Sequence, residues 1–126
     1  MAPRPLLSCP LKNGLTLFCL DQSKKIALDR WYICVRVQIT IPVIMKWFDN
    51  HPVDRETFRK ISRQLGKEIV FQQKKERHFV SDDVKIQVIK EICDSAEEMG
   101  LKYFCHDDFA AKYILKVYTD QHRSRQ

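Results

Sequence analysis

The sequence predicts an α+β fold, in which an antiparallel β-sheet of three to four strands is covered on one face by about three α-helices. Residues 31–41 carry branched aliphatic side chains at the odd positions from Ile33 to Ile41, as in a strand with one buried face. Segments 54–65 and 81–99 instead repeat apolar residues at helical spacing. No glycine-rich turn of the kind that joins a strand to a helix in parallel nucleotide-binding sheets is present. Together these patterns favour an antiparallel sheet.

Two further strands are predicted before residue 31. Asn13-Gly14 favours a type I′ turn, which joins antiparallel strands with the correct twist. Strand 6–11 would then pair with strand 15–20, and Pro10 would confine the first of them to a sheet edge. Residues 21–29 are polar and are expected to form a turn rather than a strand.

The helices and the last strand follow from their boundary residues. Residues 67–80 have β-branched and aromatic ends around a charged middle, which predicts a strand at the sheet edge. In the helix from 81, Val84, Val88, Ile92, Ala96 and Met99 belong to the stripe expected to be buried. The predicted helix starts are Asp54, Ser81 and Asp107 or Asp108, and the predicted helix exits are Gly66 and Gly100.

Length and composition predict one globular domain over residues 1–126, with 121–126 as a frayed basic tail. Hydrophobic residues make up 44% of the chain and charged residues 30%, which is ordinary for a folded protein. No segment approaches the roughly 18 apolar residues of a membrane-spanning helix, so no membrane association is expected.

The five cysteines are odd in number and widely separated, which argues against a disulfide framework or a zinc ribbon. Cys19, Cys34 and Cys93 occupy apolar positions of the predicted strands and helix, so buried, reduced thiols and a cytoplasmic location are expected. The run from Cys105 to Asp108 contains only metal-ligating residue types, but no distant Cys/His pair completes a shell. Neither a metal nor another cofactor is therefore predicted.

The net charge of +6 is concentrated in the first two-thirds of the chain. Arg55, Arg59 and Arg63 recur every four residues and therefore share one flank of the predicted helix. With the lysines up to Arg77, they make the stretch 55–77 a candidate binder of an anionic ligand such as nucleic acid or a nucleotide. A solvated helix face followed by a strand edge protected by lysine explains the same residues more simply, because no nucleic-acid-binding motif accompanies them.

The predicted function is that of a small cytoplasmic binding or regulatory domain, acting through a protein partner or by self-association into an oligomer. Trp47 and Phe48, apolar and next to charged residues, are an expected contact. A ligand site is expected where the loop 21–30, ending at Arg30, approaches Arg77 and His78. No catalytic motif is present, so an enzyme whose site has no sequence motif is the weakest alternative.

Overall fold

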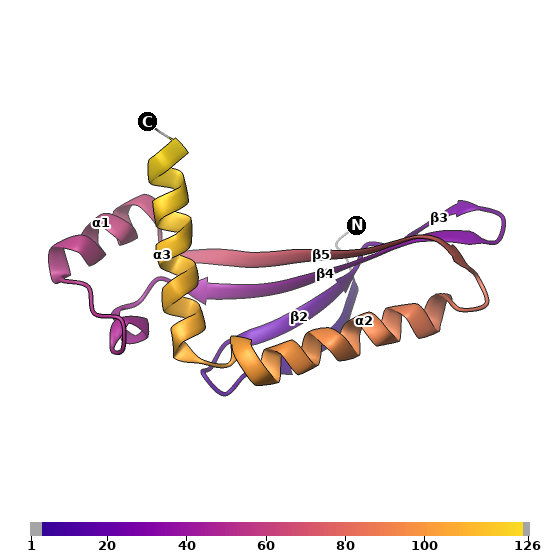
Figure 1. Cartoon of the computed structure of the whole chain (residues 1–126), viewed down its shortest axis with the longest axis horizontal. Helices are drawn as coiled ribbons and strands as arrows, with labels where there is room; N and C mark the ends of the chain where they lie inside the picture. Colours follow the sequence, from indigo (N-terminus) through magenta and orange to yellow (C-terminus); the bar gives the residue numbers. More distant parts are fainter. Residues whose placement is uncertain (1–3, 125–126) are drawn as a thin grey trace.

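The computed structural model describes residues 4–124 and contains a five-stranded antiparallel sheet and three α-helices, which confirms the α+β class with one strand more than predicted (Figure 1). The strands are β1 (Arg4–Pro10), β2 (Thr16–Asp21), β3 (Lys24–Ala27), β4 (Arg30–Pro42) and β5 (Glu68–Ser81). The α-helices are α1 (Arg55–Leu65), α2 (Lys85–Met99) and α3 (Asp107–Ser124), and the short helical turns are η1 (Met45–Phe48) and η2 (Gly100–Phe104).

β4 is the central strand of the sheet. One of its edges pairs with β5 from Arg30 to Pro42, almost the full length of both strands. Its other edge pairs with β2 over residues 35–39 and with β3 over residues 30–32. Because β1 pairs with β2, the sheet runs from β1 at one edge to β5 at the other.

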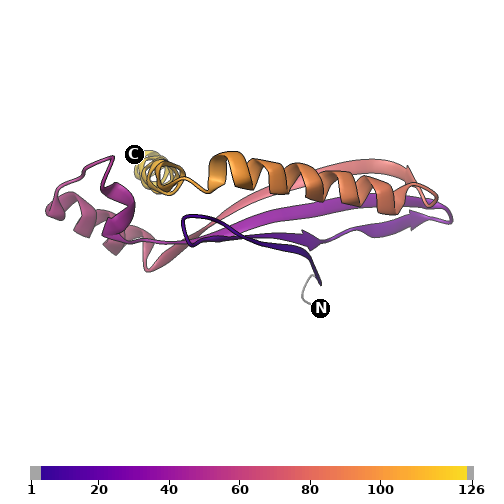
Figure 2. The ribbon, with the colours of Figure 1, turned by 90° about the horizontal axis from the view of Figure 1, so that it is seen from below.

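The core lies between the sheet and the helices α2 and α3, which occupy one face of it (Figure 2). The predicted alternation in β4 is confirmed, because its odd-numbered aliphatic residues are all at most 1% exposed. These residues are Ile33, Val35, Val37, Ile39 and Ile41. The even-numbered residues lie on the opposite face, where Arg36, Gln38 and Thr40 are half-buried.

The first hairpin exists, but its turn differs from the type I′ prediction. Gly14 has a φ of 92°, whereas Asn13 has no positive φ. Leu11 accepts a hydrogen bond from Gly14 N–H and donates one to Leu15 O, which closes a three-residue loop with glycine in the left-handed position. Asn13 is free to turn inward, and its side chain is only 7% exposed.

β3 lies where a polar turn was expected, and that prediction was wrong. Lys24 and Lys25 pair with Tyr32 and Trp31, at the end of β4 that extends beyond β2. All four residues of β3 are exposed, so this short ribbon buries no apolar face. The alternation that identifies a strand in sequence depends on such a face, and for this reason β3 has no sequence signal.

α2 begins and ends differently from the prediction. Its N-terminal cap is Val84, while Ser81 lies at the end of β5 and its hydroxyl accepts from Asp83 N–H. Gly100 does not end the helix, because its right-handed conformation continues into the π-helical turn η2. A Cβ at Gly100 would lie 3.1 Å from Leu17 Cδ1, so this glycine permits close packing against β2.

The predicted boundaries of α1 and the start of α3 are confirmed. Asp54 caps α1 by accepting a hydrogen bond from Thr57 N–H at 2.6 Å, and Gly66 follows the helix with a φ of 85°. α3 starts at Asp107 and continues to Ser124, so residues 121–124 are helical rather than frayed. Residues 125 and 126 of the predicted tail lie outside the described residues.

Trp47 and Phe48 form part of the core, so the prediction that they make an exposed contact was wrong. Their exposed fractions are 2% and 3%. Trp47 Nε1 donates to the carbonyl of Pro42 at 2.8 Å, and Phe48 packs edge-on against Phe58 of α1. Through these two rings η1 contacts both the end of β4 and α1.

Candidate functional site

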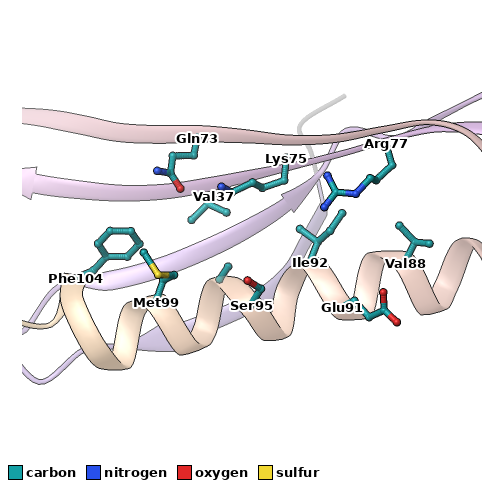
Figure 3. Close-up of a pocket in the computed structure, with 11 residues that line it drawn as sticks. Val37, Gln73, Lys75, Arg77, Val88, Glu91, Ile92, Ser95, Met99 and Phe104 are labelled. Carbon is teal, nitrogen blue, oxygen red and sulfur yellow. The ribbon is translucent and has the colours of Figure 1, made fainter.

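A hollow of about 350 Å³ lies between β5 and α2 (Figure 3). Its floor is apolar and comes from β4, α2 and η2, namely from Val37, Ile92, Ala96 and Phe104. Its sides combine β5 residues with one flank of α2, namely Gln73, Lys75, Arg77, Val88, Glu91, Ser95 and Met99. We call this set of residues the β5–α2 groove.

The groove exists because of the lateral position of α2 on the sheet. α2 packs mainly over β4, so β5 extends beside the helix rather than beneath it. Ile92 and Ala96 of the apolar stripe are buried, as predicted. Val84 and Met99, at the two ends of the stripe, are 47% and 41% exposed, so the prediction that they are buried was wrong.

The strand register determines which β5 side chains face the groove. Gln73 lies opposite Val37 and Lys75 opposite Val35, on the face that the helices cover. Arg77 lies on the same face opposite Ile33. Three long polar side chains therefore stand where a covered sheet would ordinarily place apolar ones.

The charge of the groove is carried mainly by β5. Within residues 4–124, neither Lys75 nor Arg77 forms an ion pair with a carboxylate. The Arg77 guanidinium donates to the backbone carbonyl of Glu76 at 2.8 Å. Glu91, the groove's single acidic side chain, already accepts from Gln87 at 3.1 Å. Two cations thus face an apolar floor, and neither has a partner of opposite charge among the described residues (Figure 3).

The outer edge of β5 carries no neighbouring strand in the described part of the chain, where β5 pairs with β4 alone. This edge is 14 residues long and runs beside the groove. An unpaired edge presents backbone N–H and C=O groups that can pair with another extended segment. The site therefore joins a hydrogen-bonding edge to a hollow with an apolar floor and cationic side chains.

The opposite face of the sheet carries a second set of aromatic and cationic side chains. Phe18 and Tyr32 lie there and are both half-buried. Arg36 of β4 and Lys74 of β5 lie on the same face, opposite each other in the strand register. The Lys24 ammonium lies 5.8 Å from the centre of the Tyr32 ring. Within residues 4–124, no helix covers this face (Figure 2).

Tyr32 is held at one end of this face by two neighbours. Its ring contacts that of His78 with centroids 5.2 Å apart, and its hydroxyl donates to Glu76. The pKa of Tyr32 is raised, chiefly because ionisation would break this hydrogen bond to a carboxylate.

The predicted ligand-binding residues lie in separate parts of the molecule. Arg55, Arg59 and Arg63 are exposed on α1, at one end of the elongated structure (Figure 1). Arg30 lies at the start of β4, near the other end, and forms an ion pair with Asp29. Arg77 faces the β5–α2 groove, whereas His78 contacts Tyr32 on the opposite face. Only Arg77 therefore contributes to the groove.

Among residues 4–124, the thiols and acidic residues form neither a disulfide nor a metal site. All five cysteines are free, and burial raises the pKa of the Cys19 thiol to about 12. In the part of the chain that the structure describes, no three His, Cys, Asp or Glu side chains gather to hold a metal ion. Asp108 of the predicted acidic run pairs instead with His51 at 3.1 Å. None of the helices described here has the length and apolar character to cross a membrane.

Comparison of this chain with protein-family models, with curated proteins and with solved structures finds no match.

Proposed function

We propose that this chain is a protein-binding domain that receives a segment of a partner polypeptide in the β5–α2 groove. The observation that carries the proposal is the coincidence of a 14-residue strand edge, unpaired within residues 4–124, with a hollow of about 350 Å³ that has an apolar floor. Strand edges bind extended peptides through backbone hydrogen bonds, and neighbouring pockets select their side chains.

The composition of the groove supports binding. Lys75 and Arg77 are cations without a carboxylate partner in the described chain, and Met99 is an exposed apolar side chain beside them. Methionine is common at peptide-binding surfaces because its flexible side chain adapts to different shapes. The aliphatic stems of long cationic side chains cover apolar surface while their charged ends stay in water.

A photo-cross-linking experiment tests this function. A benzophenone amino acid replaces Gln73, which lines the groove, or Gln72, the adjacent residue on the opposite face. In the cells that make this protein, we expect cross-links to one polypeptide from position 73 and not from position 72. The cross-linked segment, prepared as a pure peptide, should bind the wild-type protein in solution.

Filling the groove provides the second measurement. Ser95→Trp should lower the affinity for this peptide by about tenfold or more, because an indole occupies the space beside Ala96. Lys90→Trp, on the same helix but outside the groove, is the matched control and should bind normally. Equal cross-linking from positions 72 and 73, or unchanged affinity in Ser95→Trp, would refute the proposed function.

The uncovered sheet face favours a second candidate, the binding of an anionic ligand such as single-stranded nucleic acid. Aromatic rings on a sheet stack with unpaired bases, and nearby cations neutralise phosphates. Phe18 and Tyr32 supply the rings, and Arg36 and Lys74 supply the charge.

Salt dependence and charge reversal test the second candidate. A labelled single-stranded oligonucleotide should bind with an affinity that falls steeply as salt rises. The double variant Arg36→Glu/Lys74→Glu should abolish this binding, whereas Arg59→Glu/Arg63→Glu on α1 should leave it intact. The reverse result would place the anion site on α1, within the stretch 55–77, and salt-independent binding would exclude a phosphate-contacting mode.

A further inference from the structure

We infer that the partner segment is an acidic, extended peptide that adds to β5 as a sixth strand and places carboxylates on Lys75 and Arg77. This inference rests on the proposed function and specifies the chemistry of its partner. It predicts a peptide in which acidic and apolar side chains point toward the groove, and whose backbone completes the edge of the sheet.

Charge complementarity selects an acidic partner. Residues 74–77 of β5 carry three cations and one carboxylate. Lys75 and Arg77 both project toward the groove, where Glu91 is engaged by Gln87 (Figure 3). A carboxylate that reaches either cation gains a charge-assisted hydrogen bond without displacing an ion pair within the described residues.

The geometry selects an extended segment. Side chains on a strand alternate between its two faces, so every second residue of an added strand would point to the helix-covered side. There it would meet the flank of α2 that faces the groove. Val88, Ser95 and Met99 lie on this flank because they are separated by whole turns of the helix. Apolar side chains would cover Met99 and Val88, and acidic side chains would approach Lys75 and Arg77.

The same charges argue against a second copy of this chain as the occupant. Pairing two β5 strands edge to edge would bring two cationic segments, each containing Lys74, Lys75 and Arg77, against each other. Like charges on adjacent strands are destabilising, and lysine on an exposed edge is a known protection against self-pairing. An acidic strand meets the edge without this cost.

Capped synthetic peptides that alternate glutamate with valine are the probe. We expect calorimetry to detect binding of the Glu–Val peptide to the purified protein, and no binding of a Lys–Val peptide of equal length. Lys75→Glu and Arg77→Glu should each weaken binding by about tenfold or more, the effect of losing one charge-assisted hydrogen bond. Lys74→Glu, which reverses a charge on the opposite face of the same strand, should change it less than about threefold.

Backbone methylation separates strand addition from simple charge attraction. Two versions of the Glu–Val peptide carry N-methyl groups on alternate residues, in the two possible frames. In strand addition only one frame places its methyl groups against β5, so one version should lose binding and the other should retain it. Equal affinity of the two versions would overturn the inference.

The remaining outcomes discriminate between occupants. Binding of decanoate that is lost in Arg77→Glu, with no binding of the Glu–Val peptide, would assign the groove to a small amphipathic anion. Sedimentation that shows a dimer, strengthened by Lys75→Glu because this change removes a like charge, would assign the edge to a second copy. Equal binding of the Lys–Val peptide, blocked by Ser95→Trp, would leave the groove a peptide site and refute only its acidic specificity. Each of these results overturns the inference, whereas the proposed function depends on the cross-linking from positions 72 and 73.

Discussion

The substitution Asn13→Ala should destabilise the protein far more than its position in a surface hairpin suggests. Asn13 Nδ2 donates to the carbonyl of Phe104 at 3.0 Å and approaches that of His106 at 3.4 Å, while its Oδ1 accepts from Leu15 N–H at 3.1 Å. The side chain therefore joins the first hairpin to the segment between η2 and α3, across 91 residues of sequence.

The magnitude follows from the groups that the substitution leaves unpaired. Alanine removes the partner of the Phe104 carbonyl and that of the Leu15 amide, both in buried hydrogen bonds. An unsatisfied buried backbone group costs about 1–3 kcal/mol, so the two together should lower the free energy of unfolding by about 2–6 kcal/mol.

Urea denaturation followed by circular dichroism measures this change. The midpoint of Asn13→Ala should fall while the slope of the transition is unchanged, since the surface exposed on unfolding is similar. Lys12→Ala, in the same loop but exposed, is the control and should change the stability by less than about 0.5 kcal/mol. A loss below about 0.5 kcal/mol for Asn13→Ala would refute the assignment of these hydrogen bonds.

Three further predictions concern the caps of α1 and the buried thiol. Gly66→Ala should cost about 1–3 kcal/mol in the same urea assay, because a φ of 85° strains any L side chain, and a neutral effect would contradict this reading. Asp54→Ala should lower the thermal midpoint, because α1 loses its capping carboxylate. The hydrogen bond from Thr57 N–H holds the pKa of Asp54 below its usual range. The stabilisation by this carboxylate is therefore present above the unfolded pKa and is lost as pH falls through the folded pKa. An NMR titration that follows the chemical shift of the Thr57 amide measures this loss, and a chemical shift that does not change with pH would contradict it. Burial raises the pKa of Cys19 to about 12, so iodoacetamide at neutral pH should label this thiol only after denaturation. Mass spectrometry measures the labelling, and a labelled Cys19 in the native protein would contradict its burial.

The parts of the fold that the sequence predicts are those with local signals. β4 is identified by two-residue alternation, and α1 by a capping aspartate and a glycine exit. β3 is missed because all of its residues are exposed, so its sequence does not alternate between apolar and polar residues. Gly100 is misread because its role is a close approach to Leu17, a contact between residues distant in sequence.

The candidate site is only partly encoded in local pattern. Side chains two residues apart on a strand point to the same face, so the face that holds Phe71 also holds Gln73, Lys75 and Arg77. Polar residues on the covered face of an edge strand are a pattern that can be read from the sequence. The hollow itself depends on where α2 lies across the sheet, which results from the packing of Ile92 and Ala96 over β4. No property of a single segment determines that placement. Arg77 is named from the sequence because it lies in the basic stretch 55–77 and is expected near the loop 21–30, not because of its place on the covered face. The floor of the groove could not be named.

The central position of β4 has a consequence for biosynthesis. β4 leaves the ribosome before β5 and α2 have been made, and at about 5–20 residues per second several seconds pass before they emerge. During that interval the nascent chain presents a row of branched aliphatic side chains, together with a long strand edge that lacks its later partner. Such a segment is prone to aggregate during translation, so this chain is expected to depend on cotranslational chaperones until α2 closes over the sheet.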